Sequence, residues 1–332
     1  MNQQKLIETV ARLVSSPKGI LAADESSPTC NKRFEKLGVP TTEENRRKYR
    51  ELLITAPEIE NYISGYILFD ETIRQKTQDG RSFPEILQSK GIEIGIKVDK
   101  GTEDLPEHPG EKFTGGLEGL ADRLKEYKNF GATFAKWRAV YTISENTPSE
   151  VCMQVNAKIL AKYALACQEN DVVPIIEPEV LLDGEHTIER SYEVNFRNLE
   201  IVFSELSNLK VFLPGIILKT SMVLPGKDSK VAVHDTDIAG MTIKCLKEKV
   251  PPEIGGIVFL SGGQKDEEAT TRLNAMHQLG PLPWPLTFSY GRAIQNLALK
   301  SWAKNPNDVS GAQALLLERA KANSLASIGE YK

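Results

Sequence analysis

Residues 171–180 read DVVPIIEPEV, a short apolar run rich in β-branched residues that carries two glutamates near its end. Uninterrupted apolar runs of this length are typical of parallel β-strands that are buried on both faces. Seven other runs along the chain have the same character. They lie at residues 19–25, 63–70, 92–99, 132–141, 215–222, 255–263 and 285–293. The repetition predicts eight parallel strands.

Segments with helical periodicity separate these runs. Thr42 precedes ENRRKYRELL and is a predicted N-cap, and Pro148 after Thr147 predicts the start of another helix. Helical patterns cover residues 117–129, 148–170, 187–206, 266–278 and, after Asn307, the chain to about Ala326. The alternation predicts an α/β fold, a closed (β/α)8 TIM barrel, with residues 1–332 as a single catalytic domain. A doubly wound parallel sheet is the alternative, and residues 102–116 are expected to form a long functional loop.

Composition narrows the class of protein. The 332 residues are 40% hydrophobic and 26% charged, with a formal net charge of −4. A nucleic-acid-binding protein is usually basic, so we expect no nucleic-acid partner. The N-terminal sequence MNQQKLIETVARLV has the pattern of an amphipathic helix rather than a signal peptide, and no apolar run is long enough for a membrane span. The sequence therefore predicts a cytoplasmic protein with no membrane association.

Cysteine and histidine spacing gives no sign of a metal site. The four cysteines form no CxxC pair, and the four histidines form neither an HxH nor an HExxH motif. We expect reduced thiols and no bound metal.

Charged and small polar residues gather near the ends of the apolar runs, where a barrel of this kind carries its chemistry. They are Asp24, Glu25, Asp99, Lys100, Lys136, Arg138, Glu177, Glu179, Lys219, Ser261, Gly262, Gly263, Ser289, Gly291 and Arg292. Residues two apart in a strand point to the same face, so Lys136 shares a face with Arg138, and Glu177 with Glu179. Buried charges need partners, which leaves two interpretations: a catalytic cluster or a structural ion-pair network.

Lys219 follows the apolar residues Gly-Ile-Ile-Leu. Burial and a neighbouring cation such as Lys136 would favour its neutral amine, which is a nucleophile toward a ketone. In the alternative interpretation, Glu177 or Glu179 holds a charged lysine in a purely structural pair. The sequence by itself leaves both open.

Two groups of residues are candidates for anion binding. The segments Ser261-Gly262-Gly263 and Gly291-Arg292 end the last two predicted strands, where phosphate sites recur in TIM barrels. Lys32, Arg33, Lys100 and Arg138 form a second cationic group. Two anion sites beside a carbonyl-reactive lysine indicate a bisphosphate substrate.

At this point the chain resembles the class I fructose-bisphosphate aldolases. The matching stretches are LAADES (21–26), NRRKYRELL (45–53), GIKVDKG (95–101), FAKWR (134–138), VPIIEPE (173–179), LKTSMVLPG (218–226), FLSGGQ (259–264), LTFSYGRA (286–293) and ANSLAS (322–327). They are collinear with the family pattern and extend from the first strand almost to the end of the chain. Where animal members commonly read LKPNMV, this chain reads LKTSMV.

The resemblance implies a lyase that reversibly cleaves fructose 1,6-bisphosphate into dihydroxyacetone phosphate and glyceraldehyde 3-phosphate in glycolysis or gluconeogenesis. It implies a Schiff-base lysine at Lys219, a principal acid/base group at Glu177, and supporting roles for Asp24, Lys136 and Glu179. It assigns the substrate phosphates to Ser261, Gly262, Gly263, Ser289, Gly291 and Arg292, and to Ser26, Thr29, Lys32, Arg33, Lys100 and Arg138. It also implies a homotetramer, a sugar-phosphate substrate and no metal or other cofactor.

Rival functions remain at this stage. A transaldolase or an aldolase for sedoheptulose bisphosphate would use the same lysine chemistry, although two cationic groups favour bisphosphates over the transaldolase reaction. A non-catalytic interaction protein and a nucleotide-binding barrel are further alternatives. We expect no counterpart of the mobile C-terminal tail of animal members, which ends in a functional tyrosine, because Tyr331 lies too early in the chain. We therefore expect another group or water to protonate the enamine.

Overall fold

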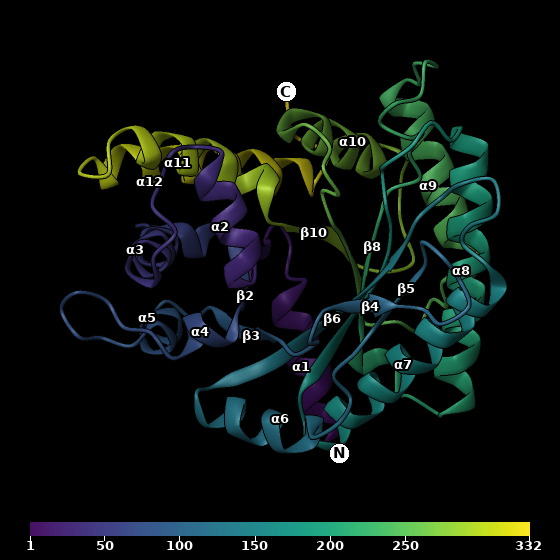
Figure 1. Cartoon of the computed structure of the whole chain (residues 1–332), viewed down its shortest axis with the longest axis horizontal. Helices are drawn as coiled ribbons and strands as arrows, with labels where there is room; N and C mark the ends of the chain where they lie inside the picture. Colours follow the sequence, from purple (N-terminus) through teal and green to yellow (C-terminus); the bar gives the residue numbers. More distant parts are fainter.

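The computed structural model describes residues 1–332 and contains a closed barrel of eight parallel strands (Figure 1). The strands are β1 (Gly19–Ala23), β2 (Ile63–Leu68), β3 (Glu93–Lys97), β6 (Ala132–Tyr141), β7 (Val173–Val180), β8 (Ile217–Thr220), β9 (Gly256–Phe259) and β10 (Leu286–Tyr290). The order around the barrel is β1-β10-β9-β8-β7-β6-β3-β2. Pairing of Ile20 with Ser289 and of Leu21 with Tyr290 closes the sheet. Each predicted run contains one strand, so the barrel is confirmed and the doubly wound sheet is wrong.

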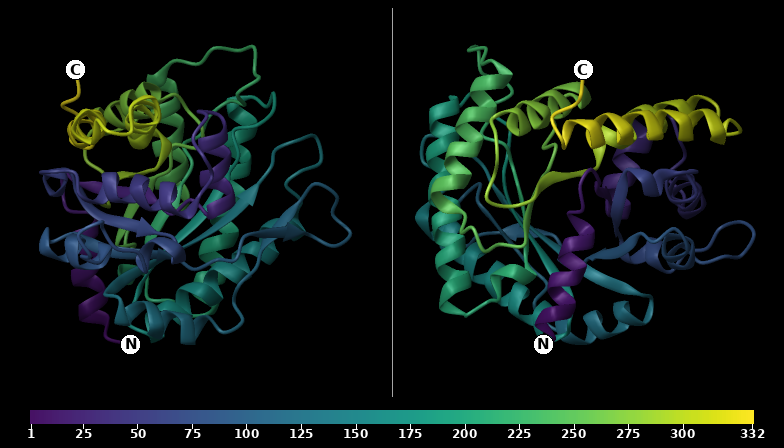
Figure 2. Two further views of the ribbon diagram at one scale, coloured as in Figure 1. Left: turned by 60° about the vertical axis from the view of Figure 1, so that its left-hand side comes forward. Right: turned by 180° about the vertical axis from the view of Figure 1, so that it is seen from behind.

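Helices surround the barrel, as the two views of Figure 2 show. They are α1 (Gln3–Leu13), α2 (Ser27–Glu35), α3 (Glu43–Ile54), α4 (Asp70–Ile73), α5 (Phe83–Ser89), α6 (Leu120–Asn129), α7 (Glu150–Glu169), α8 (Ile188–Asn208), α9 (Asp235–Lys249), α10 (Asp266–Gln278), α11 (Arg292–Lys304) and α12 (Val309–Ala326). Two short 3-10 helices cover Ile59–Asn61 and Leu213–Gly215. The Thr42 side chain accepts a hydrogen bond from the Asn45 amide, which confirms the predicted cap of α3.

Three local predictions are wrong. Helix α7 begins at Glu150 because Ser149, one residue after Pro148, caps it by accepting from the Cys152 amide. Helix α6 begins only after Gly119, whose positive φ of 64° does not continue a right-handed helix. Residues 102–116 include an antiparallel hairpin, β4 (Thr102–Asp104) with β5 (Lys112–Thr114), and are not simply a loop.

Apolar side chains fill the barrel interior below the charged carboxyl ends of the strands. Helix α1 covers that end of the barrel and adds its apolar side chains to the interior. Leu6, Val10 and Leu13 lie on one face of α1, at helical spacing. They pack against the inward-facing strand residues Ile20, Ala22, Ile67, Phe134, Val173, Ile175, Ile217 and Val258. The amphipathic N-terminal segment is therefore a plug for one end of the barrel. None of the helices combines the length and hydropathy that a membrane-spanning segment requires.

Glycines on two strands make room for a phenylalanine inside the barrel. A Cβ on Gly95 would lie 2.2 Å from the Phe134 ring, and one on Gly65 would lie 3.2 Å from it. Small and large residues therefore complement one another around the interior, as the taper of a small barrel requires.

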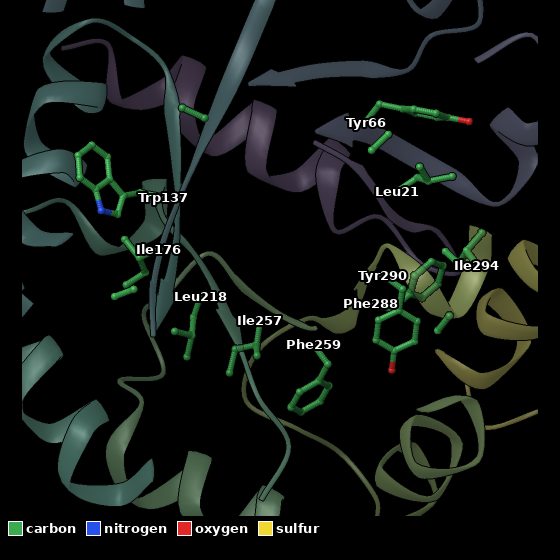
Figure 3. Close-up of a cluster of buried hydrophobic side chains, with 14 of the residues drawn as sticks. Leu21, Tyr66, Trp137, Ile176, Leu218, Ile257, Phe259, Phe288, Tyr290 and Ile294 are labelled. Carbon is green, nitrogen blue, oxygen red and sulfur yellow. The ribbon is translucent and has the colours of Figure 1, made fainter. Parts of the chain in front are cut away.

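A second, larger core lies between the strands and the surrounding helices. Figure 3 shows some of its members on neighbouring strands, among them Trp137, Ile176, Leu218 and Ile257. These residues alternate along each strand with the inward-facing set, which is the period of two expected for a pleated strand. Strands β6, β7 and β8 are therefore apolar on both faces until their carboxyl ends, where the inward face becomes charged.

Candidate active site

Strand periodicity places four ionisable side chains in one layer above the apolar interior. Asp24, Lys136, Glu177 and Lys219 each come two residues after an inward-facing apolar residue, respectively Ala22, Phe134, Ile175 and Ile217. Because successive side chains alternate between faces, all four point inward at the carboxyl end of their strand segments. The structure brings together residues that are up to 195 positions apart, from Asp24 to Lys219.

These four side chains form one chain of ion pairs. Lys136 Nζ lies 2.7 Å from Asp24 Oδ2 and 3.3 Å from Glu177 Oε2, and Lys219 Nζ lies 3.1 Å from Glu177 Oε1. Lys219 is 4% exposed and Glu177 is 3% exposed. Glu177 Oε2 has no hydrogen bond of good geometry, so its contact with Lys136 is mainly electrostatic. Two cations alternate with two carboxylates, which balances the buried charges.

Electrostatics hold three of these groups in their charged forms. Burial by itself would raise the pKa of Asp24, but Lys136 and then Lys219 outweigh it and lower this pKa to about 2. Burial also opposes ionisation of Glu177, yet Lys136, Lys219 and Arg138 hold its pKa below the usual value. For Lys136, burial would lower the pKa, whereas Asp24 and Glu177 raise it above its ordinary range. Lys136 is therefore a fixed positive charge between two carboxylates.

Next along the same strands, Arg138 Nε pairs with Glu179 Oε2. Asp99 accepts from the Lys97 amine and, at 3.4 Å, from the Arg138 amide. At the end of β8, the Ser221 hydroxyl accepts from the Val180 amide at 3.0 Å and donates to the Val180 carbonyl at 2.9 Å. Ser221 thereby joins the ends of β7 and β8 beside the cluster, a role for the serine of LKTSMV.

A cavity of about 480 Å³ opens above the cluster. It is lined by Ala22, Asp24, Glu25, Ser26, Thr29, Lys32, Arg33, Lys36, Lys97, Lys136, Arg138, Glu177, Glu179, Lys219, Leu260, Ser261, Gly262, Ser289, Gly291 and Arg292. Eight of these side chains are cationic and four are carboxylates, an excess of four positive charges in a chain whose net charge is −4. Such a field attracts anions with several charges into the cavity.

One side of the cavity is formed by the segments that follow β9 and β10. Gly262 has a φ of 56° and Gly263 a φ of 96°, a left-handed conformation that glycine adopts without strain. The Arg292 guanidinium is exposed and lies beside Gly263. An exposed guanidinium at the start of α11, next to the glycine turn that follows β9, can bind a phosphate.

Another part of the cavity wall is formed by α2 and the residues before it. The Ser26 and Thr29 hydroxyls lie 3.1 Å apart, and Lys32 and Arg33 follow one turn later. Arg33 pairs with Glu25, and Arg50 of α3 holds the other oxygen of that carboxylate at 2.9 Å. This set adds hydroxyl and cationic groups for a second anion.

The residues that line the cavity are not entirely those singled out in the sequence. Gly263 and the exposed Lys100 do not line it, whereas Lys97 and Lys36 do. Lys97 is the last residue of β3, two residues before Asp99, and its register with Lys136 puts both on one face of the sheet. Lys36 lies four residues after Lys32, one helical turn away. Both spacings are visible in the sequence and are signals for these two lysines.

No three His, Cys, Asp or Glu side chains are placed to hold a metal ion, and the four cysteines are free and buried.

Comparisons with known proteins agree with this geometry. The family model described as "Fructose-bisphosphate aldolase class-I" matches residues 5–332. The "Probable fructose-bisphosphate aldolase class 1" of Xanthomonas campestris is 53% identical over the full length of both chains. The "Fructose-bisphosphate aldolase 4, cytosolic" of Arabidopsis thaliana is 50% identical over 99% of this chain and 84% of its own.

A solved structure extends this similarity to three dimensions. The fructose-bisphosphate aldolase of Plasmodium falciparum, crystallised with TRAP and a small-molecule inhibitor, superposes with a TM-score of 0.98 at 45% identity. The match covers 99% of this chain and 95% of that chain. The chain therefore belongs to the class-I fructose-bisphosphate aldolase family.

Proposed function

We propose that this protein reversibly cleaves fructose 1,6-bisphosphate to dihydroxyacetone phosphate and glyceraldehyde 3-phosphate through a Schiff base on Lys219. The observation that carries the proposal is the buried Lys219 amine, 3.1 Å from the Glu177 carboxylate, at the floor of a cavity with four excess positive charges. Two phosphates carry nearly the same total of negative charge at neutral pH. The full-length similarity to class-I aldolases supports the same reaction.

Glu177 is placed to take part in both halves of iminium formation. Transfer of a proton from the Lys219 ammonium to Glu177 gives a neutral amine beside a carboxylic acid. The amine adds to the C2 ketone, and the acid returns a proton to the hydroxyl of the carbinolamine, which leaves as water. The iminium is an electron sink, so the lysine supplies the electrophilic chemistry that a metal would otherwise provide.

Carbon–carbon cleavage needs a base for the C4 hydroxyl. Glu177 or Asp24 removes that proton, the C3–C4 bond breaks, and the electron pair enters an enamine while the aldehyde leaves. Protonation of the enamine and addition of water then release dihydroxyacetone phosphate and restore the amine. Lys136, which stays positively charged, stabilises the negative charge that develops on these oxygens.

The two sides of the cavity would each hold a phosphate. Ser261, Gly262, Ser289, Gly291 and Arg292 would bind one, with Gly263 shaping the turn; Ser26, Thr29, Lys32, Arg33 and Arg138 would bind the other, with Lys97 and Lys36 added and Lys100 at the rim. Glu179 would orient Arg138. Held at both ends, the carbon chain is fixed over Lys219, and such positioning supplies much of the rate.

Similarity to the class-I aldolases also supports proposals about the domain organisation, oligomeric state, location and pathway of the protein. We infer that residues 1–332 act as one catalytic domain, that the enzyme is a homotetramer in the cytoplasm, and that it works in glycolysis or gluconeogenesis without a metal. The cytosolic relative from Arabidopsis thaliana supports this location, while a chloroplastic relative is 49% identical. Size-exclusion chromatography with light scattering tests the tetramer.

The decisive experiment is reductive trapping. Borohydride added with fructose 1,6-bisphosphate should reduce the iminium, inactivate the enzyme and leave a mass adduct that maps to Lys219. Activity should survive an excess of chelator. An adduct on another lysine, or none during turnover, would reject the assignment, and loss of activity with chelator would indicate metal-dependent chemistry.

A further inference from the structure

The carboxylate of Glu25 is shared between two guanidinium groups, only one of which reaches the cavity. Glu25 Oε1 accepts from Arg33 Nη1, and Glu25 Oε2 lies 2.9 Å from Arg50 Nη1. Arg50 also donates from Nη2 to the Glu25 carbonyl at 3.1 Å. Arg33 and Glu25 line the cavity, whereas Arg50 lies behind them on α3 and is only 2% exposed.

Arg33 is held in place by a buried polar network and still keeps free donors. Its Nη1 donates to Glu25 and, at 2.8 Å, to Gln295 Oε1, and its Nη2 approaches Asn296 Oδ1 at 3.4 Å. Gln295 is fixed in turn by the Tyr49 hydroxyl at 2.8 Å and the Ala22 carbonyl at 2.6 Å. A guanidinium has five N–H donors, so these contacts leave two for an anion in the cavity.

We propose that Arg50 is a positioning residue that keeps the positive charge of Arg33 available to a substrate phosphate. The inference rests on the proposed function, because it assumes that the cavity binds phosphorylated sugars. Arg33 and Glu25 alone would sum to zero charge, whereas the set of Arg33, Glu25 and Arg50 carries one net positive charge. Arg50 Nη1 lies against Glu25 Oε2 without a hydrogen bond of good geometry, so its effect on that carboxylate is mainly electrostatic.

Burial strengthens the electrostatic interaction between Glu25 and Arg33, so the charge of Arg50 affects it strongly. Water would screen the pair if it were exposed, but the side chains of Glu25 and Arg33 are each only 15% exposed. Without Arg50, the whole negative charge of Glu25 would act on Arg33 at close range. Phosphate would then compete with a carboxylate for the same N–H donors.

The test replaces Arg50 with methionine in the full chain. Arg50→Met should raise the KM for fructose 1,6-bisphosphate about tenfold with kcat changed less than about twofold. The matched control is Arg46→Met, since Arg46 lies on the same helix, pairs with Glu71 at 2.7 Å and does not line the cavity. Its KM should stay within about twofold of wild type.

A second variant separates charge sharing from simple packing. In Arg50→Met/Glu25→Gln, the carboxylate is neutral, so KM should return toward the wild-type value. A purely structural role for Arg50 predicts the opposite, because the double variant would be at least as impaired as Arg50→Met. If Arg50→Met does not fold, the single variant Glu25→Gln provides the test. Its KM for fructose 1,6-bisphosphate should fall or stay constant, and an increase in KM overturns the proposal.

Calorimetric titration with inorganic phosphate gives a readout that is independent of turnover. Performed in an Arg292→Gln background, which weakens the other proposed anion site, it should show weaker phosphate binding after Arg50→Met. Unchanged phosphate binding and unchanged KM overturn the role of Arg50 and leave the aldolase reaction intact. Failure of the wild-type protein to cleave any sugar bisphosphate would instead overturn the proposed function.

Discussion

The amine of Lys219 lies 3.1 Å from Glu177 Oε1, at the level where the inward-facing side chains of the barrel change from apolar to charged. Ile217 and Ile175, two residues earlier on the same strands, belong to the apolar interior. A layer of buried apolar side chains therefore lies on one side of the pair, and the electropositive cavity lies on the other. This position allows proton exchange between the two groups and approach of a substrate from one side only.

Removal of the amine should abolish the reaction. Lys219→Met keeps most of the side-chain volume and leaves Glu177 paired with Lys136, so the protein should fold while cleavage falls by about a thousandfold or more. Cleavage assays, circular dichroism and the borohydride adduct check this. Lys265→Met, at a lysine whose side chain is 82% exposed, serves as the control. Residual activity within tenfold of wild type would contradict a covalent role for Lys219.

Glu177→Gln should affect chemistry more than binding. The amide retains the shape of the carboxylate but cannot exchange a proton, so kcat should fall by about 10² to 10⁴ with little change in KM. Glu111→Gln is a matched buried control, because Glu111 accepts from the Ser149 amide at 2.6 Å and does not line the cavity. Steady-state kinetics distinguish the two. A rise in KM with unchanged kcat would make Glu177 a binding group only.

Asp24 should make stability depend on pH in acid. Folding lowers its pKa from 3.8 to about 2, so its contribution is complete above the unfolded pKa and is lost as the pH falls toward 2. Between about pH 5 and about pH 2, the free energy of unfolding should therefore fall more in wild type than in Asp24→Asn, by up to about 2 kcal/mol. Urea denaturation at several pH values measures this, and parallel curves would contradict it.

Arg292 should contribute to substrate binding without supporting the fold. It is exposed, so Arg292→Gln should leave the melting temperature unchanged and raise KM for the bisphosphate about tenfold to a hundredfold. Because the attraction is electrostatic, wild-type KM should also rise with ionic strength, and less steeply in the variant. Equal salt dependence in both would indicate that Arg292 does not face the phosphate.

The N-terminal plug should carry a measurable part of the stability. Leu13 is fully buried beneath the strands, and Leu13→Ala should reduce the free energy of unfolding by about 3 kcal/mol through lost burial and a cavity. Ile7, on the same helix but 39% exposed, provides the control, and Ile7→Ala should change stability by less than about 0.5 kcal/mol. Equal losses in denaturant titrations would mean that α1 does not close the barrel as described.

Much of the site could be predicted because it depends on local periodicity. In VPIIEPE, the period of two places Val173 and Ile175 on the same face as Glu177 and Glu179, whatever the rest of the chain does. The same argument predicted that Lys136 and Arg138 share a face. Start signals such as Thr42 also act within one turn, which is why the beginning of α3 was predicted correctly.

Local rules failed where several signals compete within a few residues. Thr147, Pro148 and Ser149 all favour a helix start, and only the position of the chain against the hairpin selects Ser149: Glu111, after β4, accepts from the Ser149 amide. Lys97 and Lys100 lie on either side of Asp99, and the sequence alone does not mark where β3 ends. It therefore favours Lys100, whereas the structure places Lys97 in the cavity.

The sequence by itself determined the eight barrel strands, the shared face of Lys136 with Arg138 and of Glu177 with Glu179, and the family to which the motifs point, since these depend on spacing along the chain. Only the tertiary structure decided which charges meet. Closure of the barrel sets the stagger between strands, and this stagger brings Lys219 to Glu177 and Lys136 to Asp24. It also decided that α1 plugs the barrel and that Arg50 lies behind Glu25, because such contacts join segments whose separation along the chain carries no local signal.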